Sequence, residues 1–259
     1  MTRENSIKKC FLFRFYAELN DFLPLHRRQR VFEEWYKTPI SIGDTMVSMG
    51  VPFSEVDLIL VNGTSVGMNH MLCENDRISV YPKFESLDIS ANSKLRERPL
   101  RESKFILDCH LGKLARYLRM LGFDCLYKNH MDDDVIIEIA KRDDRIILTR
   151  DKLLLKSSRI THGYYVRAIE KHAQLKEVVE KFDLYSQFKS FSRCMTCNHP
   201  LQAVSTEEIL HKIDEDTAQI FQEFYLCPDC NKVFWKGSHF KRMEEFVRRL
   251  VCSRNYSRG

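Results

Sequence analysis

Hydrophobic and polar residues follow different patterns in three stretches of this chain. Short hydrophobic runs separated by turn residues fill residues 1–88, whereas residues 104–190 alternate between strand-length runs and helical periodicity. Residues 191–259 show little periodicity until a basic helix near their end. A polar, basic stretch with one proline, residues 89–103, separates the first two and reads as a linker. The pattern therefore predicts three folded segments.

The first segment is expected to be an α+β domain with the order strand, strand, helix, strand, strand. Phe11, Phe13 and Phe15 recur at every second position, so they should share one face of the first strand. Asn62-Gly63 lies between two hydrophobic runs and favours the positive φ angles of a type I′ hairpin. The helix is expected at residues 44–50 and the last strand at residues 76–82.

The second segment is expected to be an α/β domain whose parallel sheet is covered on both faces. Strands and helices alternate along it, and such alternation joins parallel strands through right-handed crossovers. The expected strands are residues 104–108, 124–128, 145–149 and 164–168, and the expected helices are residues 111–122, 132–142 and 171–184. Residues 238–251 of the third segment read as a basic helix.

The positive charge of the chain is concentrated in its middle. The formal net charge is +5. Residues 1–88 hold 10 Lys and Arg against 12 Asp and Glu, residues 89–190 hold 21 against 15, and residues 191–259 hold 10 against 9. The excess favours a polyanionic partner for the middle segment, although many basic faces are only solvated.

Two closely spaced cysteine pairs predict a structural zinc site. The chain has nine cysteines, an odd number that argues against a disulfide framework. Cys194 pairs with Cys197 and Cys227 with Cys230, and each C-x-x-C is followed by an asparagine, as in a zinc knuckle. Two knuckles would supply the four thiolates of a zinc ribbon. A redox dithiol is the alternative, but it would need a C-x-x-C at a helix start in a thioredoxin-like unit.

Acidic residues follow each of the first three strands expected in the second segment. Asp108 ends the first strand, Asp133 and Asp134 belong to an acidic run after the second, and Asp151 lies two residues beyond the third. In a parallel sheet these positions share one rim, where a divalent cation would offset their repulsion. Mg²⁺ or Mn²⁺ held by carboxylates suits phosphodiester cleavage. Alternatively, these acids only cap helices, and both interpretations stay open.

Four basic residues near these acids are candidates for holding a nucleic-acid backbone. They are Arg116, Arg119, Arg150 and Lys152. Phosphoryl transfer onto an aspartate is a weaker hypothesis, because the chain contains neither D-x-D-x-T nor G-x-x-x-x-G-K-[ST].

Several stretches of the sequence resemble a known protein family. The stretch "KFILDCHLGKLARYLRMLGFDCLYKNHMDDDVIIEIAKRDDRIILTRDKLLL", together with "THGYYVR" and "FSRCMTCNHPL…FYLCPDCNKVFWKGSHFKRM", is similar to the Mut7-C family of PIN-like ribonuclease domains. The resemblance implies a metal-dependent nuclease whose acids Asp108, Asp133 or Asp134, and Asp151 bind the catalytic ion, with Asp133 preferred over Asp134. It also implies RNA as the substrate.

The first segment is similar to a β-grasp, ubiquitin-like module. The phrases "EVDLILVNG" and "NDRISVYPKFESLD" resemble small sulfur-carrier proteins. Those proteins end in a free Gly-Gly tail, whereas this chain continues, so an interaction or substrate-positioning module is expected instead. The module could then bind a protein partner.

Together these observations predict a PIN-like α/β domain, preceded by a β-grasp domain and followed by a zinc ribbon. The leading hypothesis is a Mg²⁺- or Mn²⁺-dependent ribonuclease with structural zinc. The alternative is a non-catalytic adaptor that associates with RNA or ribosomes. No long uncharged apolar window predicts a membrane span, and Arg14 and Glu18 interrupt the N-terminal apolar run, so a cytoplasmic address is expected.

Overall fold

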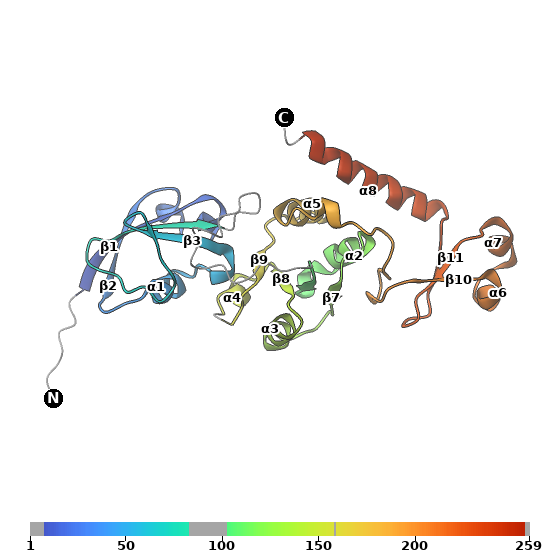
Figure 1. Ribbon diagram of the computed structural model, residues 1–259, viewed down its shortest axis with the longest axis horizontal. Helices are drawn as coiled ribbons and strands as arrows, with labels where there is room; N and C mark the ends of the chain where they lie inside the picture. Colours follow the sequence, from blue (N-terminus) through green and yellow to red (C-terminus); the bar gives the residue numbers. More distant parts are fainter. Residues whose placement is uncertain (1–7, 83–102, 158, 257–259) are drawn as a thin grey trace. The chain divides into compact units, whose positions relative to one another are not determined.

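The computed structural model describes residues 8–82, 103–157 and 159–256 (Figure 1). Apart from Ser103, the expected linker lies outside these residues. The described residues divide into two compact units. Of these residues, the first unit draws on 8–82, 132–157 and 159–165, and the second on 103–131 and 166–256.

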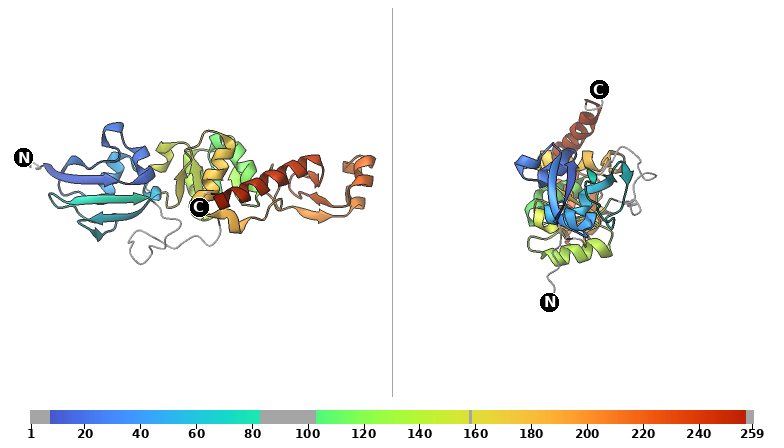
Figure 2. Two further views of the ribbon diagram at one scale, coloured as in Figure 1. Left: turned by 90° about the horizontal axis from the view of Figure 1, so that it is seen from above. Right: turned by 90° about the vertical axis from the view of Figure 1, so that its left-hand side faces the viewer.

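The N-terminal domain is a five-stranded mixed sheet with one α-helix, coloured blue to cyan in Figures 1 and 2. Its strand order is β2-β1-β5-β3-β4, with β1 antiparallel to β2 and parallel to β5. The elements are β1 (Lys8–Phe15), β2 (Phe32–Lys37), α1 (Ile42–Met49), β3 (Val56–Val61), β4 (Thr64–Ser65) and β5 (Arg77–Pro82), with the short 3-10 helices η1 (Ala17–Phe22), η2 (Leu25–Arg27) and η3 (Phe53–Glu55). This arrangement confirms the α+β expectation.

Local sequence signals account for the shape of this domain. The three alternating phenylalanines of β1 are at most 1% exposed and form the centre of its core. Helix α1 begins with a capping box between Ser41 and Asp44 and ends at Gly50, whose φ of 73° places it in the left-handed region. Asn62 and Gly63, with φ angles of 50° and 83°, form the expected turn between β3 and β4.

The second sheet is a four-stranded parallel sheet with the order β7-β6-β8-β9. Its elements are β6 (Phe105–Leu107), η4 (Cys109–Leu111), α2 (Gly112–Met120), β7 (Cys125–Tyr127), α3 (Asp133–Arg142), β8 (Ile146–Thr149), α4 (Lys152–Leu155), β9 (Gly163–Tyr165) and α5 (Lys171–Lys181). Every residue of β6 and β8 is buried, as expected for central strands of a covered sheet. Helices α2 and α5 pack side by side (Figures 1 and 2).

One strand of this sheet ends earlier than its sequence suggests. Residues 164–168 were expected to be extended, but β9 ends at Tyr165. The backbone N–H groups of Arg167 and Ala168 donate to the Glu177 carboxylate, both at 2.8 Å. These donors are therefore satisfied by a side chain of α5, which ends the regular strand.

The C-terminal region is a small antiparallel sheet followed by a long helix. It contains η5 (Leu184–Gln187), β10 (Gln202–Val204), α6 (Thr206–Ile209), η6 (Leu210–Lys212), α7 (Glu215–Ile220), β11 (Phe224–Leu226), β12 (Val233–Trp235) and α8 (Ser238–Tyr256). Helices α6 and α7 occupy the long gap between the two cysteine pairs and were not predicted. Helix α8 begins where the sequence indicates and continues beyond residue 251.

Candidate functional site

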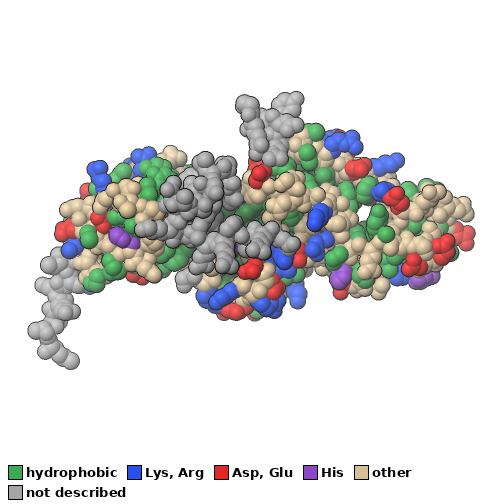
Figure 3. Space-filling view, in the orientation of Figure 1, with side chains coloured by type: hydrophobic (Ala, Val, Ile, Leu, Met, Phe, Trp, Pro, Cys, Tyr) green, Lys and Arg blue, Asp and Glu red, His purple; other side chains and the backbone are tan. Residues whose placement is uncertain are grey.

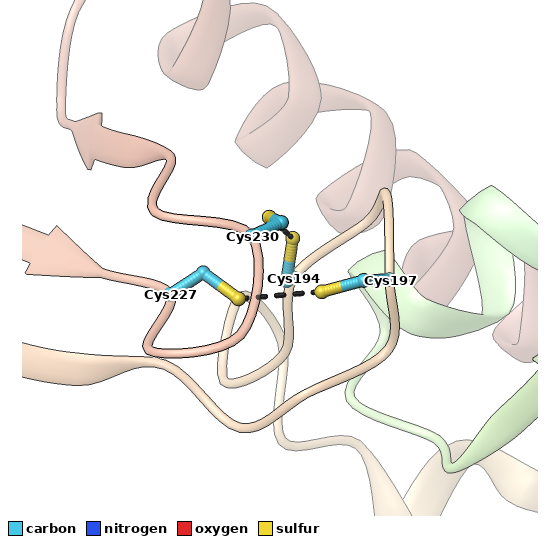
Figure 4. Close-up of side chains that lie close together, drawn as sticks. All are labelled: Cys194, Cys197, Cys227 and Cys230. Carbon is cyan, nitrogen blue, oxygen red and sulfur yellow. Dashed lines mark hydrogen bonds between the residues drawn. The ribbon is translucent and has the colours of Figure 1, made fainter.

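The four paired cysteines converge on one point, as Figure 4 shows. Their Sγ atoms all lie within 4.8 Å of one another. Cys194 Sγ is 3.6 Å from Cys230 Sγ, and Cys197 Sγ is 3.3 Å from Cys227 Sγ. Tetrahedral Zn–S bonds of about 2.3 Å would separate the sulfurs by about 3.8 Å. The cluster therefore fits a Cys₄ zinc site.

Each cysteine pair forms the same hydrogen-bonded loop. Cys194 N donates to His199 O at 2.8 Å, and Cys227 N donates to Lys232 O at 2.9 Å. The asparagine after each pair, Asn198 or Asn231, has φ of 77° or 57°. Asparagine tolerates this left-handed conformation better than most side chains, which explains its presence after both pairs.

Cys194, Cys197 and Cys230 of this cluster have shifted pKa values. Burial raises the pKa of Cys194, but backbone N–H groups of Cys197 and Thr196 and neighbouring thiols outweigh burial and lower it to about 7. Burial raises the pKa values of Cys197 and Cys230, and adjacent thiols add to the rise. A divalent cation would relieve this conflict because it binds all four groups as thiolates.

The first cysteine loop is anchored to the parallel-sheet domain through Arg119. This side chain is only 4% exposed. Its guanidinium donates to the carbonyl oxygens of Cys125 at 2.9 Å, Thr196 at 2.7 Å and Met195 at 3.3 Å. These bonds give the buried guanidinium a structural role, and a contact of Arg119 with RNA stays an untested prediction.

Asn198 provides a second anchor beside the cysteines. Its Oδ1 accepts from Cys125 N at 2.9 Å, and its Nδ2 donates to Asp124 Oδ1 at 2.8 Å. The residue that completes the cysteine loop therefore also hydrogen-bonds the start of β7. The metal-binding loop and this strand are parts of one hydrogen-bonded assembly.

Asp108 lies where β6 ends and is only 5% exposed. Its Oδ1 accepts from His110 N at 2.9 Å, which makes it the N-cap of the short helix η4. The sequence predicted Asp108 at the end of this strand, and the structure places it there with its carboxylate nearly buried. Capping uses one carboxylate oxygen for a backbone N–H and fixes the orientation of the group.

Asp151 and the acidic run occupy the starts of helices, as the alternative interpretation predicted. Asp151 caps α4, because its Oδ1 accepts from Leu153 N at 2.7 Å. Asp133 and Asp134 lie in the first turn of α3. Asp134 pairs with Arg159 at 2.6 Å. Asp134 thus has a cationic partner, and Asp133 as the preferred metal ligand remains the prediction.

The remaining basic candidates have different surroundings. Arg116 is exposed on α2. Arg150 is half-buried at the end of β8. Lys152 donates from Nζ to Asp21 O at 2.6 Å and lies over the rings of Phe22 and Tyr165. Lys152 therefore has a structural contact with the N-terminal domain, and its expected phosphate contact stays an untested prediction.

A cleft lined by His110 brings the predicted Arg116 together with two basic residues that the sequence reasoning did not select, Lys113 and Lys171. Its volume is about 760 Å³, and it is lined by Lys113 and Arg116 of α2, Lys171 of α5, and Tyr127 and Asn129 beyond β7, among others. Lys113 and Arg116 are three residues apart on the face of α2 opposite its hydrophobic stripe. That spacing is a signal in the sequence, whereas the approach of Lys171 depends on the packing of α5.

The helices inserted in the small C-terminal sheet have the opposite charge. Acidic side chains gather over α6 and α7 (Figure 3). They are Glu207, Glu208, Asp214, Glu215 and Asp216. A polyanion is repelled by such a surface, so the basic cleft is the better candidate for contact with nucleic acid.

Comparison with known families gives two matches, one to the N-terminal domain and one to most of the rest of the described chain. The model of the Mut7-C RNAse domain matches residues 103–247, and the model of the Mut7-C ubiquitin domain matches residues 8–88. No curated protein and no solved structure matches the chain. Among the described helices, none has the length and apolar character needed to cross a membrane.

Proposed function

Since the chain belongs to the Mut7-C RNAse domain family, we propose that it is a ribonuclease that hydrolyses RNA phosphodiester bonds with Mg²⁺ or Mn²⁺. The observation that carries this proposal is the position of its acids along the parallel sheet. Asp108 directly follows β6, and Asp151 lies two residues beyond β8, the neighbour of β6 in the strand order. The carboxyl ends of parallel strands form the edge at which α/β enzymes place their chemistry.

The donor set suits a hard divalent cation. Asp108, Asp133 and Asp151 would hold it through carboxylate oxygens, the ligands that Mg²⁺ and Mn²⁺ prefer. When bound, the ion would lower the pKa of a water molecule and offset the charge of the cleaved phosphate. The two capping hydrogen bonds, from His110 N to Asp108 and from Leu153 N to Asp151, hold these carboxylates in fixed orientations.

The reaction proposed is a direct hydrolysis. A water oxygen attacks the phosphorus atom, and the bond from phosphorus to the leaving oxygen breaks. One water proton passes to solvent and the leaving oxygen takes up another, so the products are a phosphomonoester and a free hydroxyl. Because the RNA 2′-hydroxyl is not the nucleophile, no 2′,3′-cyclic phosphate forms.

We also assign a structural zinc ion to Cys194, Cys197, Cys227 and Cys230. Four thiolate ligands leave no open position for a substrate, so this zinc would stabilise the fold and take no part in hydrolysis. A protein partner for the β-grasp domain and a cytoplasmic address remain predictions.

Cleavage of RNA by the full, zinc-loaded chain tests the proposal. The protein is freed of other divalent ions by dialysis, because a strong chelator would also remove zinc, and is then supplied with Mg²⁺ or Mn²⁺. We expect cleavage of an end-labelled RNA only with the added ion. Asp108→Asn and Asp151→Asn should each reduce the rate by at least about 100-fold.

Asp132→Asn is the matched control, because Asp132 adjoins the proposed ligand yet makes no side-chain cap bond. This variant should cleave at close to the normal rate. Intact RNA in the presence of both ions, or equal cleavage by Asp108→Asn and the unmodified chain, would refute the ribonuclease. Tight RNA binding without cleavage would favour the non-catalytic adaptor.

A further inference from the structure

The cleft lined by His110 has the volume of a small-ligand site. Its volume of about 760 Å³ falls within the roughly 300–1,000 Å³ of typical ligand pockets. The lining residues that matter here are Lys113, Arg116, Lys171, Tyr127, Asn129 and Ile169, all of which belong to the second unit. A single phosphate ion would fill only a small part of this space.

The charge of the cleft favours an anion. Lys113 and Arg116 are exposed and Lys171 is half-buried, and within the described residues no ion pair involves any of the three. The one acidic lining residue is Glu170, whose carboxylate accepts from His172 N at 2.6 Å and Ala173 N at 3.0 Å. Glu170 thus caps the start of α5. Three cationic side chains line the cleft, and Glu170 contributes its one negative charge.

The walls of the cleft also offer contacts for a planar base. The Tyr127 hydroxyl donates to Cys109 O at 3.0 Å and lies 2.9 Å from Asn129 Oδ1, so both side chains are held in place. A Cβ added to Gly112 would lie 2.6 Å from that hydroxyl, which explains why the approach requires glycine. Ile169 is 85% exposed at the cleft. An aromatic ring, an amide and an exposed apolar side chain therefore accompany the cations.

The cleft adjoins a proposed catalytic residue. Tyr127 hydrogen-bonds the carbonyl of Cys109, the residue that follows Asp108, and His110 both lines the cleft and donates its backbone N–H to Asp108 Oδ1. His110, the lining residue nearest to Asp108 along the chain, is two residues away from it. We propose that the cleft binds one nucleotide of single-stranded RNA, with its phosphate held by Lys113, Arg116 and Lys171.

This assignment rests on the proposed function, which identifies the nucleic acid as RNA. It adds the place at which the strand binds. A single strand is specified because its bases are unstacked and can enter a pocket, whereas an RNA duplex keeps its bases inside the helix. Cationic side chains that follow the phosphates, together with an aromatic surface for a base, are the usual means of holding single strands.

Binding of a fluorescent oligouridylate tests this inference without depending on cleavage. The full, zinc-loaded chain carries Asp151→Asn, so that RNA is not consumed, and its affinity is measured by fluorescence anisotropy at several salt concentrations. Adding Lys171→Gln should raise the Kd, whereas Lys176→Gln, on the same helix but outside the cleft, should change the Kd by less than about twofold.

A triple variant measures the number of phosphate contacts. Lys113→Gln, Arg116→Gln and Lys171→Gln together should reduce the slope of log Kd against log salt by about 2, since each single-strand contact contributes about 0.7. Unlabelled duplex RNA of equal length should compete poorly. Equal losses from Lys171→Gln and Lys176→Gln, an unchanged salt slope, or equal competition by the duplex would each overturn the proposal.

The two proposals can fail separately. Normal binding through the cleft by a chain that never cleaves RNA would overturn the ribonuclease and retain the cleft. Cleavage by a chain with the triple substitution, at unchanged KM and kcat, would retain the ribonuclease and overturn the cleft. Thermal melting of each variant verifies that the fold is intact; it should match that of the parent because Lys113 and Arg116 are exposed and Lys171 is only half-buried.

Discussion

Lys152 Nζ donates a hydrogen bond of 2.6 Å to the carbonyl oxygen of Asp21 and so joins helix α4 to the β-grasp domain. The same ammonium lies 5.4 Å from the ring centre of Phe22 and 5.1 Å from that of Tyr165. In addition, Tyr165 N donates to Glu55 Oε1 at 2.6 Å. The N-terminal domain therefore packs against the segment that carries Asp151.

Lys152→Met should destabilise the protein by about 1–3 kcal/mol, because it removes a charged hydrogen bond and two cation–π contacts and keeps most of the aliphatic stem. Urea unfolding measures the change. Lys141→Met, on the exposed face of α3, is the control and should stay within about 0.5 kcal/mol of the parent. Equal stability of the two variants would contradict a structural role for Lys152.

Asp133→Asn and Asp134→Asn should affect RNA cleavage differently. Asp134 pairs with Arg159, which also contacts Glu138, so this acid is held at the surface of α3. We expect Asp133→Asn to reduce the cleavage rate by at least about 100-fold and Asp134→Asn by less than about tenfold. The reverse order would make Asp134 the metal ligand.

Arg119→Lys should lower stability, whereas Arg116→Lys, one turn earlier on α2, should not. Lysine cannot reproduce the fork with which the Arg119 guanidinium contacts three carbonyl oxygens. The expected loss for Arg119→Lys is about 2–4 kcal/mol, measured by chemical unfolding. If both substitutions were equally mild, the anchoring of the cysteine loop by Arg119 would be wrong.

Removal of zinc should loosen β7 as well as the cysteine loops. Asn198 follows Cys197 and accepts a hydrogen bond from Cys125 N, so the order of the loop and of the strand is linked. Cys227→Ser or chelation should accelerate hydrogen exchange of the Cys125 amide, with little change in α1 of the N-terminal domain. An unchanged Cys125 amide would show that the strand is independent of the metal.

Glu170→Gln should remove a pH-dependent part of the stability. Hydrogen bonds from the N–H groups of Ala173 and His172 lower the pKa of Glu170 below its ordinary value of 4.5. Its contribution is therefore present above pH 4.5 and is lost as the pH falls through the lowered pKa. The difference in Tm between the parent and Glu170→Gln should shrink from pH 7 to pH 3. A constant difference over this range would contradict the capping role.

The sequence by itself determined most elements of the first two segments and the paired cysteines, because these depend on local signals. Alternation placed Phe11, Phe13 and Phe15 in one core, Asn62-Gly63 specified a hairpin turn, and the C-x-x-C pairs identified four ligands that the fold brings together. Each signal acts within a few residues, so its physical effect can be recognised without knowing the fold.

Only the tertiary structure decided what the basic side chains do. Arg116 and Arg119 lie three residues apart on one predicted helix, yet one lines a cleft and the other is buried against carbonyl groups 76 and 77 residues away. Lys152 likewise found its acceptor 131 residues away. Long-range packing determines whether a charged side chain lies in solvent or contacts a backbone oxygen. Local sequence patterns do not identify a partner that is distant along the chain.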